Sequence, residues 1–362
     1  MACQHGCLYC DGRAERYYIE GKFDKDIVIR SNLPEALRQE LGKIREKGVI
    51  SIGSGVSDAY QPVEAEEELM RKSAEILNEF SVPAIVLTKS DLILRDLDLW
   101  AALNKKAGFM LVVSLVFHDD QKRRIFEPKA SSVENRLRIL SEFKKKGCST
   151  GVLAMPFMPF IADSTEDIRT LYGLLEKCNV DFIMPGALTL RPGRQKDVFF
   201  RLIRNRYPDL LERIRFIFAE ERPSGVPVQG YLDEVNGRFS KVRQSADVPF
   251  LVPHSFFREK TQRYDEINIL LHHMVELYRD RKIDVKPLEG AVHKYMGWLN
   301  ERKKVYNRHS SWRYADLDGE LIELIENGEL TSLIGNERLS DFVRDIVIHR
   351  KIFDYISLKS TE

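Results

Sequence analysis

Three cysteines near the start of the sequence have the residue type and spacing of a metal-binding loop. Cys3, Cys7 and Cys10 follow the pattern C-x3-C-x2-C within one short segment. One loop can bring three such thiolates onto a soft metal centre, and cysteine thiolates are the usual ligands of iron–sulfur clusters. A [4Fe–4S] cluster normally takes four cysteines, so three leave one iron open to bind another molecule. The spacing therefore favours a catalytic cluster.

A structural zinc site is the alternative for the same segment. His5 lies between Cys3 and Cys7, and three cysteines with one histidine can form a closed tetrahedral zinc site. The protein would then be a non-enzymatic, zinc-stabilised scaffold whose helical C-terminal part binds partners. His272 and His273 offer no second metal pair, because adjacent residues of a helix face different sides.

Further along the chain, glycine and polar residues follow apolar runs. The segment 53–62 contains Gly53 and Gly55, which let a backbone approach a ligand, and Asp58, which suits an ammonium group. A plain glycine-rich turn is the alternative for this segment. Ser114 lies inside an apolar run, where a serine is usually hydrogen-bonded to the backbone.

Together these motifs resemble the radical S-adenosylmethionine (radical SAM) enzymes, and within them the group related to spore photoproduct lyase. The cysteine spacing, with Tyr9 before the last cysteine, matches the superfamily signature. The sequence T-K-S at 88–90 with R-D at 95–96 matches the group, as does Glu127-Pro128 followed by Arg136. The resemblance covers roughly residues 3–200.

The resemblance implies a [4Fe–4S] cluster on Cys3, Cys7 and Cys10 whose fourth iron binds S-adenosylmethionine. A donor such as flavodoxin or ferredoxin would reduce the cluster, and cleavage of the cofactor would give a 5′-deoxyadenosyl radical that takes hydrogen from the substrate. Lys89 would contact the cofactor's carboxylate, and Ser114 would lie near its ribose. Arg136 could pair with a carboxylate of a ligand or form a structural salt bridge with Glu127. The cofactor-binding residues implied are Tyr9, Gly53, Gly55, Ser57, Asp58, Lys89, Ser114 and Arg136.

The chain departs from the family pattern in two places. Radical SAM barrels place the cysteine loop after their first strand, whereas only Met1 and Ala2 precede Cys3. We therefore expect that the first strand is missing, that the native protein begins upstream, and that Cys3 is poorly fixed. Spore photoproduct lyases also carry a cysteine in the loop corresponding to 53–62 and a tyrosine at the position of Asp11, so the match to them is incomplete. No acid, base or hydrogen donor is assigned to the protein itself.

The elements that must position these residues alternate between apolar runs and amphipathic patterns. Strands are expected at 49–53, 83–88, 108–117, 151–156 and 180–185, with helices between them at 32–48, 63–80, 96–106, 131–147 and 164–178. Ser131 with Glu134 forms a capping box, and Ser164 with Asp167 marks another helix start. The alternation predicts an α/β fold in which a parallel sheet curls into a partial (β/α)6-type barrel.

The pattern changes after about residue 222, where the segment 223–227 has the composition of a linker. The expected domains are a radical SAM partial barrel over 1–222 and a mainly helical C-terminal extension over 223–362 that caps the barrel. Apolar stripes predict helices at 267–278 and 291–304 in this extension. Two or three short helices are expected around Gly328 and Gly335.

The bulk composition excludes some classes of protein. The net charge of +1 gives no general electrostatic case for a nucleic-acid or membrane partner. The longest apolar run, 107–117, is too short to span a bilayer, and the first 15 residues lack the apolar segment of a signal peptide. The odd number of cysteines, 5, argues against a disulfide framework. We expect a protein of the reducing cytoplasm with no membrane partner.

Local charge runs keep a nucleic-acid substrate open as an alternative. Basic runs occur at 122–124, 144–146 and 302–304, and Trp298, Tyr306 and Trp312 lie near the last of these runs. Aromatic rings beside cations are used in single-strand binding, so a nucleic-acid-directed radical enzyme, such as a DNA repair lyase, is the second interpretation. Such runs are more often solvated helix faces.

Overall fold

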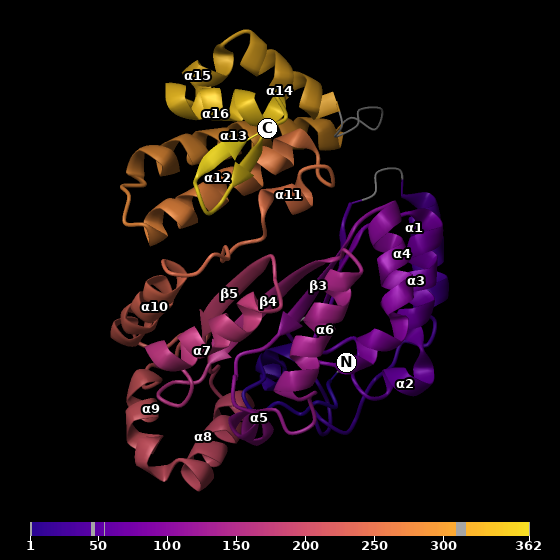
Figure 1. Cartoon of the computed structure of the whole chain (residues 1–362), viewed down its shortest axis with the longest axis vertical. Helices are drawn as coiled ribbons and strands as arrows, with labels where there is room; N and C mark the ends of the chain where they lie inside the picture. Colours follow the sequence, from indigo (N-terminus) through magenta and orange to yellow (C-terminus); the bar gives the residue numbers. More distant parts are fainter. Residues whose placement is uncertain (1, 45–47, 54, 309–315, 362) are drawn as a thin grey trace. The chain divides into compact units, whose positions relative to one another are not determined.

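The structure is a computed structural model that describes residues 2–44, 48–53, 55–308 and 316–361 (Figure 1). The chain divides into two compact units, Met1–Phe250 (unit 1) and Leu251–Glu362 (unit 2). This division lies after the boundary that the sequence suggested at residue 222. The reason is that α10 (Gln229–Arg243) packs against α7 (Thr165–Glu176) and so belongs to unit 1.

Unit 1 is built on one sheet of five parallel strands, which confirms the predicted α/β class. The strands lie in chain order: β1 (Ile50–Ile52), β2 (Ala84–Thr88), β3 (Phe109–Ser114), β4 (Ser149–Phe157) and β5 (Phe182–Ala187). Helices connect them, and parallel strands in sequential order with helical crossovers form a partial barrel. At the β5 edge, the Ile183 amide donates to the Pro249 carbonyl at 2.9 Å, so the end of unit 1 returns to the sheet.

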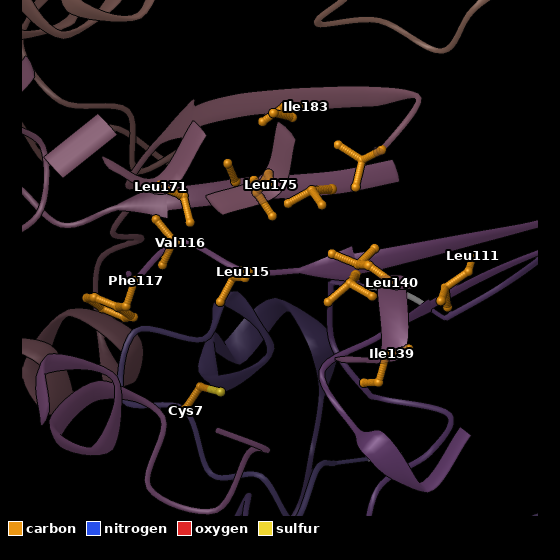
Figure 2. Close-up of a cluster of buried hydrophobic side chains, with 14 of the residues drawn as sticks. Cys7, Leu111, Leu115, Val116, Phe117, Ile139, Leu140, Leu171, Leu175 and Ile183 are labelled. Carbon is orange, nitrogen blue, oxygen red and sulfur yellow. The ribbon is translucent and has the colours of Figure 1, made fainter. Parts of the chain in front are cut away.

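The helices of unit 1 cover the sheet because their apolar faces need a partner. α1 (Leu33–Lys43), α3 (Leu69–Phe80) and α4 (Leu97–Lys106) pack together beside the sheet (Figure 1). All six residues of β3 are buried, as expected for a parallel strand covered on both faces. Figure 2 draws part of the core, including Leu115 after β3, Leu140, Leu175 and Cys7 of the cysteine loop.

The expected helix over 63–80 is in fact two helices, α2 (Glu64–Glu67) and α3. Glu68 between them has φ 52°, a left-handed conformation that interrupts the helix. The Glu64 carboxylate accepts the Met70 amide at 2.8 Å, so one donor of the first turn of α3 is satisfied across the break. Neither Gly nor Pro marks this break, and the apolar periodicity continues across it, so the sequence does not predict it.

The two predicted helix starts have different outcomes. Ser132, not Ser131, caps α6 (Val133–Lys145) by accepting the Asn135 amide at 3.1 Å. Ser131 instead donates to Asp91 at 2.7 Å, which removes it from the capping role. Ser164 caps α7 by accepting the Asp167 amide at 3.0 Å, as predicted.

The remaining helices of unit 1 follow β3 and β5. α5 (Asp120–Phe126) lies between β3 and α6, and α8 (Arg194–Arg206) and α9 (Leu211–Ile217) precede α10. β3 ends at Ser114, earlier than predicted, although Leu115, Val116 and Phe117 after it remain buried.

Unit 2 is mainly helical, as the sequence predicted. Its helices are α11 (His254–Phe257), α12 (Arg263–Asp280), α13 (Lys286–Arg308), α14 (Asp316–Glu326), α15 (Glu329–Ile334) and α16 (Glu337–Val347). Gly328 and Gly335 flank α15, and both have positive φ. The sequence did not predict the antiparallel pair β6 (Ile352–Asp354) and β7 (Lys359–Thr361). Across the described part of the chain, none of the helices combines the length and apolar character needed to cross a bilayer.

Candidate active site

A cavity of about 430 Å³ in unit 1 gathers most of the residues that the sequence singled out. Its walls come from the cysteine loop, from 55–58 after β1, and from the ends of β2 and β3 at Lys89 and Ser114. The second half of β4 and the segment that follows β5 complete the lining. Parallel barrels place their active sites at the carboxyl ends of the strands, which is where this cavity lies.

All three predicted cluster ligands, Cys3, Cys7 and Cys10, line this cavity. Arg13 fixes the loop that carries them, because its guanidinium donates to the Cys7 and Gly6 carbonyls at 2.9 Å each. Gly6 has φ 66°, which a residue without a Cβ adopts at no steric cost. The Leu8 amide donates to the Phe126 carbonyl at 2.9 Å and joins the loop to the end of α5.

Cys3 is held firmly, contrary to the expectation that it would be poorly fixed. Its amide donates to the Phe23 carbonyl at 3.1 Å. The neighbouring Gln4 makes a reciprocal contact with the loop after β1, because its amide donates to Gln61 at 2.8 Å and its side-chain oxygen accepts the Val63 amide at 2.6 Å. Ser57 donates to the Ala2 carbonyl at 2.8 Å. Contacts from distant parts of the chain thus hold Cys3 and its neighbours.

The donor set and its cavity fit a [4Fe–4S] cluster, which cysteine thiolates hold. Burial raises the pKa of the Cys3 thiol to about 11 and raises the pKa values of Cys7 and Cys10. The thiols are therefore neutral at pH 7, and cluster binding must release their protons. Among the described residues, no group of three or more His, Cys, Asp or Glu side chains is placed closely enough to hold a single metal ion. The fit to a cluster therefore rests on the three thiols and the cavity that they share.

Asp58 lines the cavity, but its carboxylate is already engaged by the protein. It accepts the Thr88 hydroxyl and the Lys89 amide at 2.7 Å each and the Tyr60 amide at 2.9 Å, and it lies 3.3 Å from His5 Nε2. Burial alone would raise its pKa, but the contacts from His5, Thr88 and Lys89 hold it at about 2. Three hydrogen bonds and the nearby His5 ring thus surround this carboxylate. Asp58 therefore organises the loops around the cavity.

Lys89 and Ser114 both line the cavity and contact each other. Lys89 Nζ donates to the Ser114 hydroxyl at 2.6 Å. Among the described residues, no carboxylate oxygen lies within 4.0 Å of Lys89 Nζ, which is the distance limit for an ion pair. A cation held only by a neutral hydroxyl can exchange that partner for an incoming carboxylate, which forms a stronger charge-assisted bond.

The two glycines of the loop after β1 have different surroundings. Gly55 lines the cavity, and its carbonyl accepts from the Cys10 thiol at 3.7 Å. Gly53 does not line the cavity, and a Cβ added there would meet the Leu87 carbonyl oxygen at 2.6 Å. Gly53 therefore permits the close approach of the loop to β2, and this packing role differs from the cofactor contact that the resemblance implied.

Tyr9 and Arg136 belong to one buried network. Tyr9 lines the cavity, and its hydroxyl donates to Glu127. Arg136 does not line the cavity, and it forms with Glu127 the salt bridge that the sequence left open as an alternative. Its Nη1 also donates to the Ser114 carbonyl at 3.0 Å.

Five further polar residues line the cavity that the sequence did not assign as cofactor contacts: His5, Asp11, Thr88, Thr189 and Gln195. Asp11 is held by Arg191 at 2.6 Å. Gln195 donates to the carbonyls of Tyr9 and Thr189 at 2.9 Å each, which joins the segment after β5 to the cysteine loop. His5 could have been found from its place between two cysteines. Thr189 and Gln195 lie beyond the last predicted strand, where no local motif marks them.

The three basic runs do not form free cationic patches among the described residues. Each of their nine members contacts a carboxylate on a nearby or distant residue: Lys122 with Asp167, Arg123 and Arg124 with Asp120, Lys144 with Asp181, Lys145 with Glu142, Lys146 with Asp98, Arg302 with Glu320, Lys303 with Asp265, and Lys304 with Glu301. The Tyr306 hydroxyl also contacts Glu320, and Trp298 packs against Tyr295. Trp312 lies outside the described residues. The charge runs that suggested a nucleic-acid substrate are therefore largely neutralised.

Comparisons with known sequences give one family and several relatives. An uncharacterized protein of Mycobacterium tuberculosis is 27% identical over 221 residues, which cover 60% of this chain and 64% of that protein. An uncharacterized protein of Methanocaldococcus jannaschii is 28% identical over 242 residues, which cover 67% of this chain and 84% of that protein. The match thus spans less than two thirds of the mycobacterial relative.

Among solved structures, spore photoproduct lyase complexed with dinucleoside spore photoproduct has a TM-score of 0.49 and 15% identity, covering 68% of this chain and 72% of that chain. Native anSMEcpe with bound AdoMet has a TM-score of 0.36 and 14% identity, covering 57% and 58%.

The family comparison concerns the part of the chain that carries the cysteine loop. Residues 1–172 match the family model of the Radical SAM superfamily, and this range contains the three cysteines, Lys89, Ser114 and the strands β1 to β4. The segment that carries the cysteine loop is therefore similar to the Radical SAM superfamily.

Proposed function

We propose that this protein is a radical SAM enzyme in which Cys3, Cys7 and Cys10 hold a [4Fe–4S] cluster. When reduced, that cluster supplies the electron that cleaves bound S-adenosylmethionine and so starts hydrogen abstraction from a substrate. One observation carries the proposal: the three cysteines share a single cavity with Lys89, whose ammonium donates, among the described residues, to the neutral Ser114 hydroxyl. The cofactor's carboxylate would meet Lys89 in this cavity.

The chain's own residues would bind and orient the cofactor. Lys89 would exchange the Ser114 hydroxyl for the carboxylate of the methionine part, while the occupied Asp58 keeps Lys89 in place through its amide. The Gly55 carbonyl is a backbone acceptor in the cavity for the amino group. Leu153, Met155 and Leu188 form an apolar wall at the ends of β4 and β5 that would exclude water from the reacting atoms.

The proposed chemistry needs a partner that delivers one electron. We assign this role to a small redox protein of the flavodoxin or ferredoxin type. A reducing cytoplasm suits such a donor, an iron–sulfur cluster and the free cysteines of this chain.

The test is release of 5′-deoxyadenosine by the anaerobically reconstituted, dithionite-reduced protein supplied with S-adenosylmethionine. We expect release by the native protein and none by Cys7→Ala. Cys178→Ala is the matched control, because Cys178 does not line the cavity, and we expect it to keep iron binding and release.

Two results would contradict the proposal. One is a native protein that binds iron and S-adenosylmethionine but releases no more 5′-deoxyadenosine than Cys7→Ala. The other is a protein that takes up zinc in preference to iron at the three cysteines, which would favour the zinc-stabilised scaffold.

A further inference from the structure

A chain of buried polar contacts joins the cysteine loop to the sheet and takes no direct part in the proposed cofactor binding. The Tyr9 hydroxyl donates to one oxygen of the Glu127 carboxylate, and the other oxygen pairs with Arg136 at 2.5 Å. Arg136 then reaches the Ser114 carbonyl at the end of β3. Glu127 and Arg136 are both 0% exposed, so the ion pair is fully removed from water.

Stability alone does not explain this ion pair. Removing two charges from water costs about as much as their attraction returns, and well-packed apolar replacements of buried pairs are often equally stable. Among the described residues, the Arg136 Nε also has no hydrogen-bond partner, and a buried unsatisfied donor adds a further cost. A role in positioning accounts for the pair better than a role in stability.

We propose that Tyr9, Glu127 and Arg136 form a brace that fixes the turn between Cys7 and Cys10 relative to the end of β3. This inference rests on the proposed function, because it gives the brace the task of placing two cluster ligands. A phenylalanine at position 9 would supply the same ring to the cavity but could not make the contact with Glu127. The hydroxyl of Tyr9 is therefore the group that the brace requires.

The brace also ends on a residue that contacts the proposed carboxylate-binding lysine. Ser114 accepts Arg136 through its carbonyl and Lys89 through its hydroxyl. The turn that carries Cys7 and Cys10 and the position of Lys89 are thus set by one connected network. Hydrogen bonds to the residues around a metal ligand orient that ligand and tune the metal centre.

A close structural match elsewhere in unit 1 provides the control. Tyr231 donates to the Asp163 carboxylate at 2.9 Å, and Arg238 pairs with the same carboxylate at 3.0 Å. Tyr9 and Tyr231 are 6% and 4% exposed, and Tyr231 does not line the cavity. Tyr9→Phe and Tyr231→Phe therefore remove equivalent hydrogen bonds, of which only the first belongs to the brace.

The first measurement uses the protein without its cluster. The rates at which iodoacetamide alkylates Cys7 and Cys10 in the native state are followed by peptide mass mapping. Because a local opening is suppressed by the contacts that hold it closed, we expect Tyr9→Phe to raise these rates about tenfold. Tyr231→Phe should leave them unchanged. If Cys7 and Cys10 are alkylated at equal rates in Tyr9→Phe and Tyr231→Phe, at matched global stability, the proposed brace is wrong.

The second measurement uses the reconstituted protein. We expect Tyr9→Phe to retain less iron and to change the EPR spectrum of the reduced cluster, while Tyr231→Phe resembles the native protein. The double variant Glu127→Leu with Arg136→Met removes both buried charges together, so it avoids an unpaired one, and it should behave as Tyr9→Phe does. A double variant with native alkylation rates and a native spectrum would contradict the inference.

These two measurements separate the brace from the proposed function. If the native protein binds no iron, the proposed function fails, but the alkylation rates still decide whether the brace fixes the turn. If the native protein binds iron and cleaves S-adenosylmethionine while Tyr9→Phe alters nothing, the brace fails and the proposed function stands.

Discussion

Lys89 is the only lysine or arginine among the described residues that lines the cavity. Lys89→Met keeps most of the side-chain volume but removes the charge. A hydrogen bond to a charged group contributes about 1.5–3 kcal/mol, so we expect the dissociation constant for S-adenosylmethionine to rise about 10- to 150-fold. Equilibrium binding to the reconstituted protein, followed by the change in its EPR spectrum, measures this effect.

The control for that substitution is Lys146→Met, which removes an exposed lysine paired with Asp98. Iron content should be native in both variants, because neither residue holds the cluster. Unchanged affinity in Lys89→Met would show that the carboxylate of the cofactor binds elsewhere in the cavity.

The sequence predicted residue types at the site better than it predicted their partners. Cys3, Cys7, Cys10, Lys89 and Ser114 line one cavity, and each sits in a local motif or directly at a strand end that the sequence displays. Which groups engage Asp58 depends on contacts between loops that lie far apart in the chain. Such contacts leave no local pattern, so the occupied state of this carboxylate could not be predicted.

At the scale of elements, the loop after β1 offers a matched pair of glycines. Gly53 has φ 103° and a Cβ there would lie 2.6 Å from the Leu87 carbonyl, whereas a Cβ at Gly55 would meet nothing within 4 Å. We expect Gly53→Ala to lower the free energy of unfolding by about 2 kcal/mol or more, because both the backbone conformation and the contact are unfavourable. Chemical denaturation measures this change.

Gly55→Ala should leave the unfolding free energy nearly native and weaken S-adenosylmethionine binding, since Gly55 lines the cavity. The two substitutions thus separate the packing role of one glycine from the binding role of the other. A stable Gly53→Ala protein, or a Gly55→Ala protein with native affinity, would contradict this assignment.

The end of the chain gives an element whose stability should depend on pH. His273 of α12 contacts the Tyr355 hydroxyl at 2.6 Å, which joins the helix to the turn between β6 and β7. Burial, with His272 and His254 nearby, lowers the pKa of His273 from 6.5 to about 4. The unfolded chain therefore binds a proton that the folded chain does not, and stability is present above pH 6.5 and is lost as the pH falls toward 4.

Protonation of His273 should lower the free energy of unfolding by about 3 kcal/mol over this pH range. His273→Gln should show a shallower decrease in the stability of unit 2 between pH 6.5 and 4, measured by amide hydrogen exchange in α12. His293→Gln, at an exposed position of α13, should keep the native pH dependence. If the stability of unit 2 falls equally with pH in the native protein and in His273→Gln, this histidine does not cause the pH dependence.

Elements with a long apolar period were predicted well, and short ones were not. The five parallel strands and the helices α12 and α13 follow from their periodicity. β6 and β7, with three residues each, lie outside the alternation of strands and helices that made the equally short β1 recognisable. The division of the chain after Phe250 differs from the boundary expected at residue 222 because α10 packs against α7, and the linker composition at 223–227 does not reveal this packing.

At the scale of the whole molecule, α10 completes unit 1. Tyr231 and Arg238 of α10 satisfy the buried Asp163 in the loop after β4, and Phe239 packs against Phe157 with ring centroids 5.1 Å apart. The same stretch of β4 lines the cavity through Met155 and Pro156. Phe239, well beyond position 222, thus supports the strand that lines the proposed active site.

The position of the boundary can be tested by comparing two shortened chains. A chain that ends at Phe250 keeps α10 and the contact between Pro249 and Ile183, so we expect it to unfold cooperatively and to bind iron. A chain that ends at Arg222 leaves Asp163 buried without Tyr231 and Arg238, and an unpaired buried charge costs about 3–5 kcal/mol. We expect that chain to be poorly folded.

The measurements are thermal unfolding by circular dichroism and iron content after reconstitution. If the chain ending at Arg222 matches the chain ending at Phe250 in thermal unfolding and in iron content, the boundary lies at residue 222. If the chain ending at Phe250 is folded and also releases 5′-deoxyadenosine, cofactor cleavage resides in unit 1. Unit 2 would then be unnecessary for cofactor cleavage, as expected if the cofactor binds in a cavity whose described lining lies in unit 1.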